Sequence, residues 1–72
     1  MHFLTATDSQ RAALTAMPAH ANGLFPFGAV TNGGNFLTFY AYNLADAISY
    51  CERRVNRDAT SKRQMVRNIV TL

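Results

Sequence analysis

The chain has 72 residues, the size of one domain, and 49% of them are hydrophobic. Only 15% are charged, below the roughly 25% typical of globular domains, and the formal net charge is +3. No apolar stretch approaches the roughly 20 residues that a membrane span requires, and no secretory signal pattern is present. Because Cys51 is the only cysteine, an internal disulfide is excluded. We therefore expect a cytoplasmic protein with one globular domain over residues 1–72.

This composition also predicts contact with a partner. A domain of this length buries only about 60% of the surface that its unfolded chain exposes. With few charged residues to cover the remainder, apolar side chains must lie at the surface, and large exposed apolar patches usually mark contact sites. We expect a protein partner, and a homodimer is the simplest form of such an association.

The first predicted elements are a short strand and a short helix. The apolar run at 3–6 predicts an edge strand. Thr7 and Gln10 then have the spacing of a capping box, which predicts a helix over 8–17 that ends before Pro18. The buried side of this helix is expected to consist of Ala13, Leu14 and Met17.

A β-hairpin is the clearest local signal in the chain. After a predicted loop at 19–24, two β-prone runs at 25–31 and 34–42 flank Asn32 and Gly33. An Asn-Gly pair between such runs favours a two-residue type I′ turn, because both central residues of that turn have positive φ.

The two-residue turn also predicts the register of the hairpin. Ala29 would lie opposite Phe36, and Phe27 opposite Thr38. Because side chains alternate between the faces of a strand, one face would carry Val30, Leu37, Phe39 and Ala41. The other would carry Phe27, Ala29, Phe36, Thr38, Tyr40 and Tyr42. A shift of one residue exchanges the faces of one strand relative to the other.

A second helix is predicted over 44–57, with Asn43 as its N-cap. Its apolar stripe has helical spacing and consists of Leu44, Ala47, Ile48, Cys51 and Val55. Residues 59–72 have two readings. Ser61 and Gln64 form another capping-box pattern, which favours a helix. The alternative is a final strand at 69–72, where the residues are β-prone.

The predicted fold class is α+β. An antiparallel hairpin, with two to four strands in total, would pack against two or three helices. If the C-terminal segment is a strand, the order along the chain becomes βαββαβ, as in ferredoxin-like folds.

No residue pattern indicates catalysis. His2, His20 and Cys51 lack the paired spacing of zinc ligands. Cys51 lies in an apolar stripe, where a buried thiol is typically inert. The glycines at 33 and 34 are explained by a turn, since a phosphate-binding loop needs further glycines or a lysine. We expect no enzyme, no metal and no cofactor.

The aromatic strand has one family resemblance. The run Phe36-Leu37-Thr38-Phe39 resembles the third strand of RNA-recognition motifs, and His2-Phe3-Leu4 would correspond to their first strand. The leading basic residue and the first stacking aromatic of that motif have no match around Gly33 and Gly34. The resemblance implies stacking of bases on the sheet.

These features predict a partner-binding surface made of aromatic and basic residues: Phe27, Phe36, Tyr40, Tyr42, Arg53, Arg54, Arg57, Lys62 and Arg63. We expect a small non-catalytic protein-binding module, an accessory or inhibitory factor of the phage or mobile-element type, for example an anti-defence inhibitor. It would dock through an aromatic sheet face and the basic C-terminal segment. The alternative is a binder of single-stranded nucleic acid or nucleotides, in which the aromatics stack on bases and the arginines contact phosphates.

Overall fold

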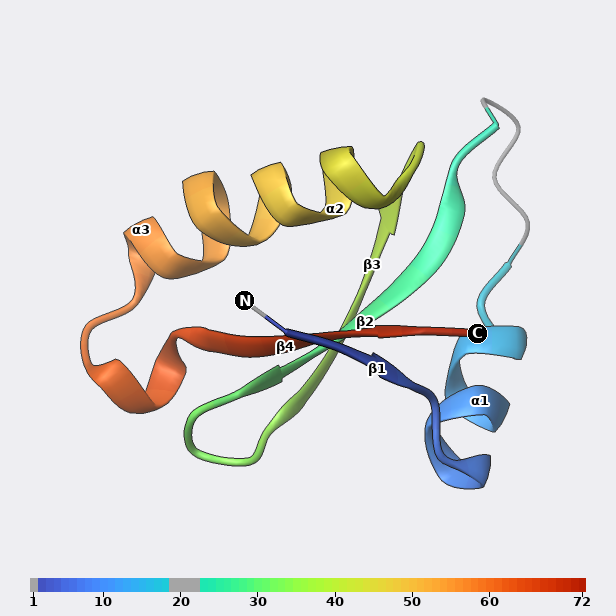
Figure 1. Cartoon of the computed structure of the whole chain (residues 1–72), viewed down its shortest axis with the longest axis horizontal. Helices are drawn as coiled ribbons and strands as arrows, with labels where there is room; N and C mark the ends of the chain where they lie inside the picture. Colours follow the sequence, from blue (N-terminus) through green and yellow to red (C-terminus); the bar gives the residue numbers. More distant parts are fainter. Residues whose placement is uncertain (1, 19–22) are drawn as a thin grey trace.

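The computed structural model describes residues 2–18 and 23–72 and forms an α+β fold (Figure 1). The elements follow in the order β1 (His2–Thr5), α1 (Asp8–Thr15), β2 (Phe25–Thr31), β3 (Phe36–Ala41), α2 (Leu44–Tyr50), the π-helix η1 (Cys51–Val55), α3 (Asn56–Asp58), the 3-10 turn η2 (Lys62–Gln64) and β4 (Val66–Thr71). The strands form one mixed sheet in the order β1-β4-β2-β3, where β1 is parallel to β4 and the other pairs are antiparallel. None of the helices in this part of the chain is long and apolar enough to cross a membrane.

Helices cover both faces of the sheet. The run from α2 to α3 lies along one face, and α1 lies on the other (Figure 1). Neighbouring residues of β4 point to opposite sides, so Ile69 packs with Ala47 and Cys51, whereas Val70 packs with Leu14. The fold therefore has two small cores separated by the sheet.

The N-terminal elements confirm the predicted strand and helix. The capping box is present: the Thr7 hydroxyl accepts from the Gln10 amide at 3.2 Å, and Gln10 Oε1 accepts from the Thr7 amide at 3.0 Å. Leu14 is fully buried, but Ala13 is exposed and does not belong to the buried side. Residues 19–22 of the predicted loop lie outside the described residues.

The hairpin forms, but the predicted type I′ turn is wrong. Of the residues described, only Gly23 and Gly34 have positive φ, and Gly34 has φ 88°. The Gly34 amide donates to the Thr31 carbonyl at 2.9 Å, and the Thr31 amide donates to the Asn35 carbonyl at 2.9 Å. The connection is thus a three-residue loop with a left-handed glycine at its end, which is the next most common hairpin geometry.

The longer loop moves the register by one residue. Phe27 pairs with Phe39 and Val30 pairs with Phe36. Phe27 and Ala29 therefore share a face with Leu37, Phe39 and Ala41, and Val30 shares one with Phe36, Thr38 and Tyr40, so the predicted face sets were wrong. Gly28 favours this register because a Cβ at that position would lie 2.5 Å from Phe36 Cε1. The missing side chain leaves room for the ring.

The predicted second helix is present as the unbroken run of α2, η1 and α3. Asn43 caps it, since its Oδ1 accepts from the Asp46 amide at 2.8 Å. Ala47, Ile48, Cys51 and Val55 reach the core, whereas Leu44 is 40% exposed and does not. The helix widens to π geometry at 51–55, where the Asn56 amide donates to the Cys51 carbonyl.

The preference for a C-terminal helix was wrong, and the alternative strand is present as β4. Ser61 makes no side-chain cap, and Gln64 Oε1 accepts instead from the Thr60 amide at 2.8 Å. Ile69 and Val70 are fully buried in the middle of the sheet, where β-branched residues pack well on both faces. The chain order is strand, helix, strand, strand, helix, strand, but the sheet order β1-β4-β2-β3 with β1 parallel to β4 does not confirm the ferredoxin-like arrangement.

Candidate functional site

The predicted aromatic surface is divided between the two faces of the sheet. Phe27 is half-buried beneath the second helix and stacks on Phe39 with 6.1 Å between ring centroids. Phe36 packs against the core on the α1 side. Tyr40 is half-buried, and its hydroxyl donates to the Pro18 carbonyl at 2.6 Å. Of the four predicted aromatics, only Tyr42 is exposed, at 54%.

The strands that resemble an RNA-recognition motif do not form a shared platform. β1 and β3 lie at opposite edges of the sheet, separated by β4 and β2. Phe3 on β1 and Phe36 on β3 also belong to different faces, since Phe3 pairs with Ile69 and Phe36 packs on the Val70 side. Bases cannot stack on both rings at one site.

The predicted basic residues are all exposed, on three elements that follow one another along the chain. They are Arg53 and Arg54 on η1, Arg57 on α3, and Lys62 and Arg63 on η2. The tip of the hairpin rests against η2, because the Asn32 side chain donates to the Lys62 carbonyl at 2.8 Å and the Gly33 amide donates to the Arg63 carbonyl at 2.9 Å. The η2 turn is therefore held against the hairpin.

Cys51 is fully buried in the core beneath the second helix. Burial raises the pKa of its thiol to about 11, and the neighbouring Glu52 carboxylate adds to the shift. A thiol of this kind is a poor nucleophile. Across residues 2–18 and 23–72, no three side chains of His, Cys, Asp or Glu are grouped so that they could hold a metal ion.

The outer edge of the sheet at β1 exposes apolar side chains on both faces. All four β1 residues are exposed, with Phe3 at 47% and Leu4 at 48%. Leu72, which follows the end of β4 beside β1, is exposed as well. β1 contains no Lys, Arg, Asp, Glu or Pro, the residues that usually protect an edge strand from pairing with another chain.

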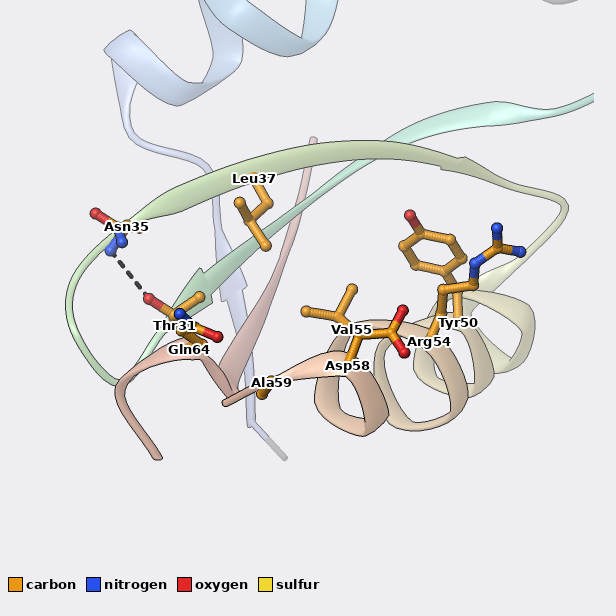
Figure 2. A pocket seen from close by; sticks show the side chains of 9 residues that line it. All are labelled: Thr31, Asn35, Leu37, Tyr50, Arg54, Val55, Asp58, Ala59 and Gln64. Atoms are coloured by element: carbon orange, nitrogen blue, oxygen red, sulfur yellow. Dashed lines mark hydrogen bonds between the residues drawn. The ribbon is translucent and has the colours of Figure 1, made fainter. Parts of the chain in front are cut away.

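A cleft of about 430 Å³ lies between the second helix, the hairpin and η2 (Figure 2). Its floor is formed by half-buried or buried residues, and its rim by exposed polar ones. The lining residues are Thr31, Asn35, Leu37, Tyr50, Arg54, Val55, Asp58, Ala59 and Gln64. Figure 2 shows Asn35 and Gln64 at one end, Tyr50, Arg54 and Asp58 at the other, and Leu37 and Val55 between them.

Hydrogen bonds inside the protein hold the walls of the cleft. The backbone amide of Asn35 donates to the Thr31 hydroxyl at 3.1 Å, drawn as the dashed line in Figure 2. The Asn56 side chain accepts from the Val66 amide at 2.7 Å, which ties α3 to the start of β4. Because these bonds need no ligand, the cleft is preformed.

Most of the cleft residues were not predicted from the sequence. Arg54 was predicted, whereas Tyr50, Asp58, Asn35 and Gln64 were not. Tyr50 stacks on Phe39 with 4.6 Å between centroids and is 38% exposed. Its place beside the apolar stripe of the helix was a usable signal. No sequence signal indicated Asn35 and Gln64, because their position depends on contacts between η2 and the hairpin tip, about thirty residues apart in the chain.

No protein-family model matches this chain, and no curated protein and no solved structure matches it either. Its function must therefore be argued from its own residues.

Proposed function

We propose that the chain is a small non-catalytic protein-binding module that docks through the open β1 edge of its sheet. The observation that carries this proposal is the exposure of Phe3 and Leu4 on opposite faces of an edge strand that contains no Lys, Arg, Asp or Glu. An added strand would satisfy the outward backbone groups of β1, and its side chains would cover both apolar residues.

The first partner that this edge fits is a second copy of the chain. Two β1 strands that pair antiparallel across a twofold axis would make one continuous sheet from two subunits, and side chains of each strand would cover Phe3 and Leu4 of the other. The low charge content of the chain supports this pairing, since charge is what normally keeps such edges apart. The role as an accessory or inhibitory factor, and the binding role of the basic segment, stay predictions.

The test is sedimentation equilibrium of the chain and two variants over about 1 to 500 μM, because mass action favours dimers at high concentration. Leu4→Lys places a charge on the edge, and Tyr42→Lys places one on an equally exposed apolar side chain away from β1. We expect the parent chain and Tyr42→Lys to dimerise and Leu4→Lys to remain monomeric. A parent chain that stays monomeric throughout contradicts self-pairing, and loss of the dimer only in Tyr42→Lys moves the interface away from β1.

A further inference from the structure

The cleft has an apolar floor between two polar ends. Leu37 and Val55 form an apolar floor, so a flat hydrophobic group can lie on it. At one end Asn35 and Gln64 provide amide groups, and the Gln64 amide is oriented because its Oε1 accepts from both the amide and the hydroxyl of Thr60, at 2.8 and 3.1 Å. Oriented amides can read the hydrogen-bonding edge of a planar ring.

The opposite end carries the charges. Arg54 and Asp58 are exposed, lie about one helical turn apart and border the same cleft. A guanidinium matches the geometry of a phosphate, and a carboxylate accepts hydrogen bonds from sugar hydroxyls. Beside them the Tyr50 ring is fixed in its plane by stacking on Phe39, with an interplanar angle of 16°.

The backbone geometry of the helix that forms one wall of the cleft also supports a ligand site. Arg54 and Val55 lie in the π-helical segment η1, where the helix widens between regular turns. Segments of this kind are rare and occur frequently at functional sites, because they redirect side chains away from the ordinary helical positions. Here the segment is the wall that carries both a charged rim residue and part of the floor.

We propose that the cleft binds a nucleoside monophosphate. The base lies on Leu37 and Val55 with its edge toward Asn35 and Gln64, and the phosphate is bound by Arg54. The volume of about 430 Å³ falls within the range of roughly 300–1,000 Å³ that small-ligand sites occupy. This site is separate from the β1 edge, so the two proposals stand or fall independently.

The test is titration of the full chain with AMP, UMP, adenosine and ribose 5-phosphate, followed by heteronuclear NMR and calorimetry. We expect AMP or UMP to shift the amide signals of cleft residues. Adenosine and ribose 5-phosphate, which each retain only part of the ligand, should bind at least about tenfold more weakly than AMP. No shift with either nucleotide, or ribose 5-phosphate binding as tightly as AMP, would overturn the proposal.

A matched pair of variants separates the site from general charge attraction. Arg54→Gln removes the guanidinium at the cleft, and Arg53→Gln removes one from the adjacent exposed position, which does not line it. We expect Arg54→Gln to weaken nucleotide binding by about tenfold or more and leave adenosine binding unchanged. Arg53→Gln should keep the parent affinity. Equal losses in the two variants would show that only net charge is being sensed.

Discussion

Cys51 shows how a single residue was predicted correctly from its neighbours. Its place in the apolar stripe of the helix predicted a buried, inert thiol, and it is fully buried with a raised pKa. Tyr40 shows the opposite case. Alternation in the strand indicated an open aromatic surface, but the Tyr40 hydroxyl donates to Pro18, at the far end of the α1 segment. A pattern within one strand cannot reveal what packs over it.

The raised pKa of Cys51 predicts a loss of stability in alkali. The thiol ionises near 9.0 when unfolded but only near 11 in the fold, so between these values the unfolded chain has already lost a proton that the folded chain keeps. Its contribution is complete below the lower pKa and is lost as the pH rises through the higher one. The free energy of unfolding should fall across this window by on the order of 1 kcal/mol per pH unit more than in Cys51→Ala.

The measurement is urea unfolding of the parent chain and Cys51→Ala at a series of pH values. All other titratable side chains are the same in both proteins, so their effects cancel in the difference. Parallel pH profiles would show that the thiol is not protected by burial.

At the level of elements, local signals and long-range pairing had different outcomes. The capping box of α1 and the apolar stripe of the second helix each depend on residues close together in the sequence, and both were confirmed apart from Leu44, which is exposed. The hairpin was also correct, but one additional loop residue exchanged the faces of β2 relative to β3. The central strand β4 was given lower preference, since its burial comes from strands far away in the sequence.

The junction between α3 and β4 depends on one side chain. Asn56 Oδ1 accepts from the Val66 amide, and Val66 is buried. Asn56→Ala leaves that amide without its partner and should lower the free energy of unfolding by about 1–3 kcal/mol. Asn56→Asp keeps an oxygen at the same position and should cost less. Thermal and urea unfolding of both variants provides the check, and equal losses would mean that the hydrogen bond contributes little.

At the scale of the whole molecule, the sequence predicted a surplus of apolar surface on the hairpin, and the structure places only part of it there. The four aromatic residues of the hairpin were expected to form the exposed face, yet helices cover much of both faces of the sheet. Tyr42 is exposed as expected, and the part of the surplus that was not predicted lies at Phe3, Leu4 and Leu72 along β1. The reason is topological: β1 becomes an edge only because β4 returns to pair with it, and that parallel pairing joins the two ends of the chain.

Hydrogen exchange of the β1 amides tests the docking edge most directly. At concentrations where the parent chain is dimeric, we expect the β1 amides that do not bond to β4 to be protected, and this protection to disappear on dilution and in Leu4→Lys. Exchange at β1 that is equally fast at every concentration, or protection that develops only elsewhere, would contradict the account.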